Sequence, residues 1–296
     1  MPSANLKSHL QLNLIVFIWG FTAILGELIT LADVNLVWYR MGLAGIFLLL
    51  YAKWAGLPLV LPLKEAGKLI LVGGLIAVHW IYFFKAIDMA NVSITLAMFS
   101  LGAFFGSILE PIFFNRRMLW YEVFFGLVII AGLYVMMQVE MEHFWGAVAA
   151  LFSVFIGVVF TLFNGKLTRD HDAVVITTYE FFAGFFFVTL YLLATGKMDS
   201  AFFNVSGTDW MYLLVLASVC TAYAFTASVG VMRKLTPYTV MLTTNLEPVY
   251  GILLAYFIIG ESERMSTSFY IGAGVILLTV IANGVLKNRG KQIPAQ

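Results

Sequence analysis

This sequence has few charged residues. Only 33 of its 296 residues are Asp, Glu, Lys or Arg, against about a quarter in soluble domains, and 61% of its residues are apolar. A water-soluble domain of this size could not cover its surface with so few charges, whereas lipid requires an apolar exterior. The composition therefore predicts an all-α integral membrane protein, because a helix satisfies its own backbone hydrogen bonds in lipid.

Other scarcities exclude whole classes of function. A net charge of +1 provides no basic field for nucleic acid. The single cysteine, Cys220, allows neither an intrachain disulfide nor a cysteine-based metal site. The chain has no Gly-x-x-x-x-Gly-Lys-Ser/Thr loop, no His-Glu-x-x-His and no Gly-x-Ser-x-Gly. These absences indicate a protein that is not an enzyme, has no cofactor and does not use a nucleotide. Without a nucleotide, the energy for moving any solute uphill must come from an ion or solute gradient, and the proton is the candidate coupling ion.

Long apolar runs fill nearly the whole chain. A spanning helix needs about 20 mostly apolar residues. The run from Leu10 follows Lys7 as in a signal peptide, but it is long and contains Trp19 and Glu27, so we interpret it as the first helix. Ten spans are predicted, at about 10–31, 34–54, 67–87, 91–114, 118–138, 144–165, 173–195, 209–231, 237–260 and 268–287.

Basic residues orient these spans. Thirteen of the 17 Lys and Arg residues fall in segments on the side of the N-terminus, three fall on the other side, and Arg40 lies within a span. Basic loops stay in the cytoplasm. The sequence thus predicts a multi-pass protein of the cell (inner) membrane with both termini cytoplasmic.

The spans divide into two halves of five. We expect a first five-helix repeat at 6–139, a second at 140–288 and a cytoplasmic tail at 289–296. An odd number of spans in each half forces the halves into opposite orientations, as in many secondary transporters. Residues 89–138 also align with 235–284 without gaps in hydropathy and loop placement. The predicted fold is ten transmembrane helices in two inverted repeats around a central cavity.

Several short patterns resemble a known family. The ninth span carries a Pro-containing apolar run around Pro248, followed by Gly260-Glu261 and then a Gly-bearing helix, while Trp19-Gly20 and Arg40 mark the first two spans. Together these resemble the EamA family of the drug/metabolite transporter superfamily. The resemblance implies ten helices around a central cavity and export or permeation of amino acids and related metabolites. One departure is residues 115–117, Asn-Arg-Arg, where the family has an acidic residue after the fourth span.

Polar residues deep in the spans are candidates for substrate contact, because an ionisable group inside the membrane costs free energy and is usually functional. Glu247 is either a structural hydrogen-bond donor, a substrate ligand or a proton site, since burial disfavours its charged form. His79 is either a structural hydrogen-bonding residue or a substrate ligand, and its aromatic neighbours favour binding. The predicted substrate-binding residues are Trp19, His79, Tyr82, Phe99, Tyr223, Asn245 and Glu247.

A second group is expected to gate or to stabilise the bundle. Arg40 and Glu180 hold comparable early positions in the second and seventh spans, so inverted symmetry places them towards opposite membrane faces with separate contacts. Pro248 removes a backbone hydrogen bond and frees a carbonyl one turn back.

The aromatic, weakly charged cavity suits amino acids, including aromatic and apolar ones. A permease for purines, drug-like amines or other neutral solutes is the alternative, and an intramembrane enzyme is the runner-up from another class. The expected partners are a small-molecule substrate and membrane lipid, with the chain as a monomer or weak dimer.

Overall fold

The computed structural model describes residues 4–115 and 141–290, together with 124–125, 127–128, 131–132 and 134 between them. Within these residues, eight helices are long and apolar enough to cross a membrane, and no strand occurs. The prediction of a helical, multi-pass membrane protein is confirmed. Most of the predicted fifth span, 118–138, falls outside the described residues.

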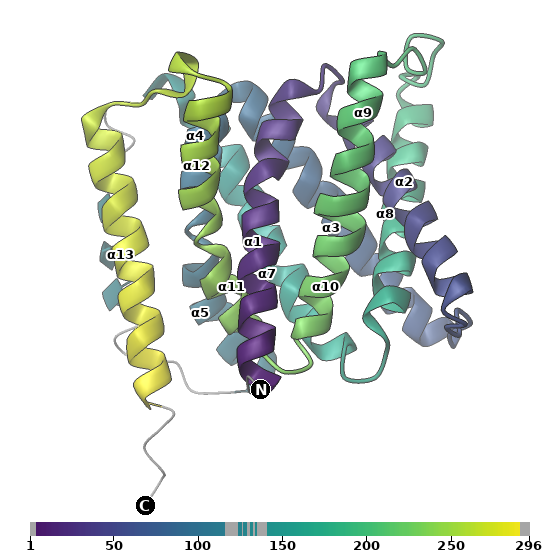
Figure 1. The fold of residues 1–296 in the computed structure, drawn as a ribbon, viewed down its shortest axis with the longest axis horizontal. Helices are drawn as coiled ribbons and strands as arrows, with labels where there is room; N and C mark the ends of the chain where they lie inside the picture. Colours follow the sequence, from purple (N-terminus) through teal and green to yellow (C-terminus); the bar gives the residue numbers. More distant parts are fainter. Residues whose placement is uncertain are drawn as a thin grey trace, which may run out of the picture.

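The elements follow one another in a bundle (Figure 1). The first half contains α1 (Ala4–Leu28), α2 (Asp33–Trp54), α3 (Leu63–Met89), α4 (Val92–Phe99) and α5 (Gly102–Phe114). The second half contains α7 (Phe144–Leu167), α8 (Ala173–Ala194), α9 (Gly207–Val215), a π-helical segment (Leu216–Tyr223), α10 (Ala224–Val231), α11 (Pro237–Thr244), α12 (Glu247–Ile258) and α13 (Thr267–Gly290). Two 3₁₀ turns, Met141–His143 and Glu261–Glu263, precede α7 and α13. In Figure 1, α1 begins and α13 ends at the lower end of the bundle.

Short polar side chains begin several of these helices. Asn91, Asp172, Ser206 and Thr236 are N-caps whose side-chain oxygens accept hydrogen bonds from backbone N–H groups two or three residues on. Such caps satisfy donors that have no partner within the helix. Pro237 follows Thr236 in the first turn, where its missing N–H costs nothing.

Two predicted spans are not continuous. The span expected at 91–114 is divided into α4 and α5 by Ser100 and Leu101, and the span at 237–260 into α11 and α12 by Asn245 and Leu246. The second break lies within one residue of the place that the 89–138 to 235–284 alignment assigns to the first. Each break comes near the middle of its span and is a tightened turn, in which the N–H groups of both residues donate to carbonyl oxygens three residues back.

The helix contacts repeat when the two halves are exchanged. α3 packs against α7 and α8, while α10 and the π-helical segment pack against α1, and that segment also packs against α2. α4 contacts α12 and α7, while α11 contacts α5 and α1. α2 and α8 contact each other. Each half thus packs largely on the other, and the interior lies between them.

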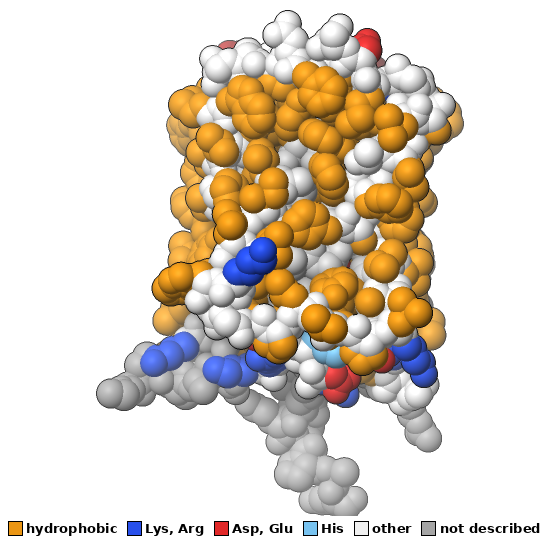
Figure 2. Space-filling model, turned by 90° about the vertical axis from the view of Figure 1, so that its right-hand side faces the viewer, with side chains coloured by type: hydrophobic (Ala, Val, Ile, Leu, Met, Phe, Trp, Pro, Cys, Tyr) orange, Lys and Arg blue, Asp and Glu red, His pale blue; other side chains and the backbone are white. Residues whose placement is uncertain are grey.

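Apolar side chains cover the outside as well as the core. Figure 2 shows hydrophobic side chains over most of the height of one face, with most Lys and Arg side chains towards the lower end. Exposed examples are Leu50, Trp145, Phe257 and Leu278, each more than half exposed. A surface of this kind is stable in lipid and not in water.

A carboxylate from the second half closes the start of α4. Glu263, 3% exposed, accepts hydrogen bonds from the backbone N–H groups of Val92 (3.1 Å) and Ser93 (2.9 Å) and from the Ser93 hydroxyl (2.8 Å). A negative charge at a helix N-terminus is stabilised by the helix dipole. The loop before α13 is thereby attached to the first half at the upper end.

Candidate functional site

A cavity lies between the two halves. Its wall takes residues from α1, α2, α3, α4, α5, α7, α10, α11 and α12, and its roughly 930 Å³ of space not filled by protein includes the solvent at its opening. The broken helices supply wall residues at or beside both breaks, among them Phe99, Gly102, Asn245 and Glu247. This central cavity is therefore where the interrupted spans meet.

The cavity extends towards one end of the bundle. Its lining reaches Met232, just after α10, and Val240, in the first turn of α11. In the other direction it stops at Thr22 of α1 and Phe83 of α3, each six residues before its helix ends. The open direction is the end where α1 begins, and the opposite end is closed by packed side chains.

The structure brings most of the predicted binding residues together. Trp19, His79, Phe99, Asn245 and Glu247 all line the cavity. Two others do not belong to its described wall. The ring of Tyr82 packs edge-on against Phe152, with centroids 4.7 Å apart, and Tyr223 is 49% exposed on the outside of the π-helical segment. Both tyrosines were expected to face the cavity, but Tyr82 packs against Phe152 and Tyr223 lies at the surface.

His79 is held in one orientation by Ser153 of α7. Its Nδ1 lies 2.8 Å from the carbonyl oxygen of Ser153, and the Ser153 hydroxyl donates to the carbonyl oxygen of His79 (2.7 Å). A carbonyl oxygen only accepts, so Nδ1 carries the proton and Nε2 of a neutral imidazole is left as an acceptor. Phe99 and Phe160 flank the ring, at centroid distances of 5.7 and 5.2 Å.

Arg40 forms part of the closed end. Its guanidinium lies over the ring of Trp80, 3.8 Å from the centroid, and its Nε donates to the Thr221 hydroxyl (2.7 Å). The side chain is 2% exposed, and Nη1 has no hydrogen-bond partner. A stacked guanidinium keeps its planar fork available for a carboxylate. The π-helical turn directs Thr221 inwards, where its hydroxyl also donates to the carbonyl oxygen of Leu216 (2.7 Å).

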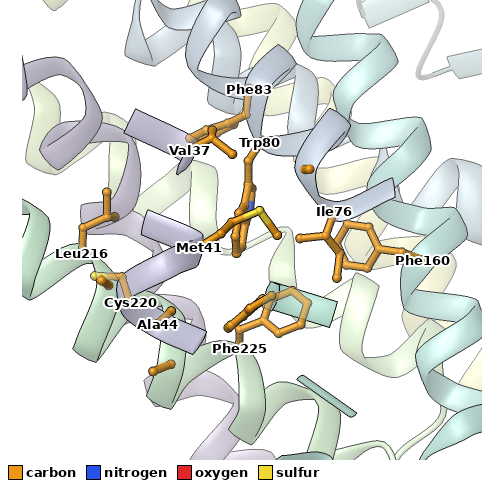
Figure 3. Packing of buried hydrophobic residues seen from close by; sticks show 14 of the residues in the cluster. Val37, Met41, Ala44, Ile76, Trp80, Phe83, Phe160, Leu216, Cys220 and Phe225 are labelled. Carbon is orange, nitrogen blue, oxygen red and sulfur yellow. The ribbon is translucent and has the colours of Figure 1, made fainter. Parts of the chain in front are cut away.

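Aromatic rings surround the Arg40 end of the cavity. Figure 3 shows Trp80 between Met41 and Phe83, with Phe160 and Phe225 nearby. Trp80 and Phe225 are 5.9 Å apart between centroids, and Phe160 and Phe225 are 5.8 Å apart. These rings come from α3, α7 and α10, so their contacts join the two halves.

Glu247 begins α12 immediately after the second break. It is 6% exposed, lines the cavity and makes no hydrogen bond to another described residue. Pro248 follows in the first turn of α12, where it starts the helix rather than kinking a continuous one. The helix N-terminus favours a negative charge at this position, and Arg40 lines the same cavity.

Glu180 lies behind the wall and not on it. It is fully buried, and its Oε2 accepts a hydrogen bond from Nδ2 of Asn164 (3.3 Å), a residue that lines the cavity. Its Oε1 has no partner. Arg40 and Glu180 form no ion pair in the described part of the chain, and their contacts are separate.

Unpaired polar atoms gather at this cavity. Nη1 of Arg40, Nδ2 of Asn245 and Oδ1 of Asn164 are buried without a hydrogen-bond partner, and all three residues line it. Most buried polar groups in proteins are paired, so a group of unpaired ones in one cavity points to a ligand. Among the described residues no cluster of His, Cys, Asp or Glu could hold a metal ion.

Sequence reasoning missed several wall residues. Trp80 and Phe160 were indistinguishable from packing aromatics, because depth alone does not say which way a helix is turned. Asn164 was placed at the end of its span, although its intramembrane position made it a candidate. Thr221, which bonds to Arg40 but is not in the wall, gave no signal, since a hydroxyl in a helix usually bonds to its own backbone.

The fold and cavity define a multi-pass helical membrane protein, and comparison with known proteins identifies its class. The model of the EamA-like transporter family matches the chain twice, over residues 6–138 and 144–284. The chain belongs to this family of membrane transporters in the drug/metabolite transporter superfamily. One solved structure, titled "Crystal structure of protein", has a TM-score of 0.70 and 17% sequence identity, covering 95% of this chain and 98% of that one, and so shares the fold. A search of curated proteins finds no match.

Proposed function

We propose that the protein is a secondary transporter of α-amino acids with aromatic or apolar side chains, working by alternating access. The observation that carries the substrate is the pairing of opposite charges in one aromatic cavity. Among the described residues, Arg40 and Asn245 present N–H donors without a partner, and Glu247 presents a carboxyl without a hydrogen bond. A zwitterion supplies one partner for each: its carboxylate for the donors and its ammonium group for the acid.

The rest of the wall suits the side chain of such a substrate. Trp19, Trp80, Phe99 and Phe160 provide apolar and π surface. His79 Nε2 adds an acceptor for the ammonium group. A phosphorylated substrate would require several cations, and within the described wall Arg40 is the one Lys or Arg residue.

The mechanism rests on the two halves. The doubled family match, the two helix breaks and the exchangeable helix contacts support an inverted repeat. Ten spans complete this scheme, with 118–138 as the fifth. In the present conformation the cavity opens at the end where α1 begins. Rocking the halves would close this end and open the other.

Basic loops orient the protein in the cell membrane. Lys64, Lys166 and Arg233 lie in helix ends or connections at the end where α1 begins, whereas Lys197 and Arg264 lie at the other end. By the positive-inside rule the cavity faces the cytoplasm in this conformation, and both termini are cytoplasmic.

Transport by purified protein in proteoliposomes tests the substrate class. A labelled panel of amino acids is followed for uptake and efflux, with and without a pH gradient, and against protein-free liposomes. We expect exchange of phenylalanine, tryptophan and leucine. An aromatic amine without the carboxylate and an aromatic acid without the amine should compete at least tenfold more weakly, since each leaves a buried charge unpaired. Equal competition by the amine contradicts the zwitterion and favours a permease for drug-like amines.

A further inference from the structure

α2 and α8 are related by a local two-fold axis. Both are 22 residues long, and corresponding residue numbers differ by 140. A Cβ atom added to Gly42 would lie 2.8 Å from the ring of Phe185, and one added to Gly45 would lie 3.3 Å from the ring of Phe182. With this difference of 140, Gly42 corresponds to Phe182 and Gly45 corresponds to Phe185. Each contact is thus the counterpart of the other across the axis.

The same relation pairs Arg40 with Glu180. Both lie three to four residues before the point where the axis crosses their helices. At 1.5 Å of rise per residue this places each about 5 Å from the axis, on opposite sides, because the helices are antiparallel. Arg40 is 2% exposed and Glu180 is 0% exposed. A buried cation and a buried carboxyl therefore hold equivalent positions in the two halves.

Only one of the two lines the cavity in this conformation. Arg40 lies on its closed end, whereas Glu180 is separated from it by one side chain, that of Asn164. The elements packed on α8 include α2, α3 and α10, and the ionisable groups on their cavity faces are Arg40 and His79. Neither makes an ion pair or hydrogen bond with Glu180 among the described contacts. A residue that served only to anchor α8 would not leave Oε1 unpaired in a fully buried site.

We propose that Glu180 is a second substrate-binding residue, which lines the closed end of the cavity when the protein opens on the opposite side. The proposal rests on the alternating access proposed above. Exchanging the conformations of the two halves gives Glu180 the position that Arg40 holds now and withdraws Arg40 behind the wall. The chemical group that Glu180 takes is the substrate ammonium.

The cavity then has a different charge at its closed end in each conformation. When open to the cytoplasm it presents the guanidinium of Arg40 to the substrate carboxylate. When open to the other side it presents the carboxyl of Glu180 to the ammonium group. A zwitterion satisfies both, whereas a simple amine or a simple acid satisfies one conformation only.

Thiol labelling tests this exchange without any substrate. In a Cys220→Ser background, Arg40→Cys and Glu180→Cys are made separately and treated with a membrane-impermeant thiol reagent in sealed vesicles of both orientations. Position 40 should react from the side where α1 begins, and position 180 from the opposite side. Ala183→Cys is the matched control: it is buried on α8 against Gly73, and its equivalent, Leu43, does not line the cavity, so it should stay unlabelled. Labelling of position 180 from the α1 side alone, or from neither side, overturns the proposal.

Glu180→Gln gives a second readout that does not depend on thiols. The Michaelis constant for substrate supplied on the side opposite to the start of α1 should rise at least tenfold, while that for substrate supplied on the α1 side changes less than twofold. An equal change on both sides overturns the proposal. If the cysteines label from opposite sides but no amino acid is transported, the substrate class fails and the role of Glu180 at the alternating cavity stands. If amino acids are transported while both cysteines label from one side, the role of Glu180 fails and the substrate class stands.

Discussion

At the scale of single residues, Ser153 fixes which nitrogen of His79 faces the cavity. Replacing His79 by Ala should weaken the apparent affinity for substrate about tenfold, because a hydrogen bond to a charged group contributes about 1.5–3 kcal/mol. The folded fraction in detergent should change little. Substrate competition and gel filtration measure the two effects. Ser153→Ala, which keeps the backbone carbonyl bonded to Nδ1, is the matched control and should have a smaller effect. Loss of folded protein with unchanged affinity in the remainder would show that His79 is structural.

Glu247 allows the binding and coupling roles to be separated. Gln keeps the size of the neutral acid but cannot titrate or carry a negative charge. If Glu247 binds the ammonium group, Glu247→Gln should reduce exchange and gradient-driven transport alike, by about tenfold or more. Counterflow and pH-gradient uptake in the same liposomes measure both. Normal exchange with a lost response to the pH gradient would instead assign it to proton coupling, and no change in either would make it structural.

Residue depth was readable from the sequence, but the direction of a side chain was not. His79 and Glu247 were found because ionisable groups deep in a span are costly, and Trp19 because it lies too deep for the interfacial aromatic belt. Tyr82 is three residues from His79, yet the packing of α3 turns its ring towards Phe152. Tyr223 ends a π-helical segment, whose extra residue per turn rotates the positions that follow. Neither effect leaves a mark in hydropathy.

At the scale of elements, Gly73 sets the distance between α3 and α8. A Cβ atom there would collide with the backbone carbonyl of Glu180 and lie 2.8 Å from the Cβ of Ala183. Because backbone cannot yield as a side chain can, Gly73→Ala should lower the thermal midpoint in detergent, corresponding to about 1–3 kcal/mol. Gly67→Ala, on the same helix with nothing within 4 Å, should leave the midpoint unchanged or raise it. Equal midpoints for the two variants would contradict this contact.

The helix breaks were beyond prediction from pattern. Ser100-Leu101 and Asn245-Leu246 contain neither Gly nor Pro, so nothing distinguishes them from helical sequence. Only Pro248 pointed near the second break, and it was interpreted as freeing a carbonyl within a continuous span.

At the scale of the whole molecule, the topology can be measured directly. Alkaline phosphatase fused after Leu57, in the loop between α2 and α3, should be inactive because the proposed orientation places that loop in the cytoplasm. A fusion after Ser200, in the loop between α8 and α9, should be active. Green fluorescent protein at the same two sites should give the reverse pattern. Activity at both sites, or at neither, would contradict opposite sides and the orientation with it.

Hydropathy and charge were enough to predict the class of fold and the boundaries of most spans. α2, for example, was expected at 34–54 and occupies Asp33–Trp54. Lipid explains this success, since every spanning residue meets the same solvent requirement. The cavity was harder to predict, because it depends on which faces of nine helices meet.

The bond between Glu263 and the start of α4 has a consequence for biosynthesis. The N–H groups of Val92 and Ser93 leave the ribosome about 170 residues before the carboxylate that accepts from them. Until then the upper end of α4 has only the Asn91 cap (Oδ1 accepting from Ile94 N–H at 2.8 Å). The first half can therefore be inserted early but reaches its final form only when the last loop has been made. A nascent chain that stops before Glu263 leaves this helix start without its carboxylate, so such a truncation leaves the first half unfinished as well as removing the tail.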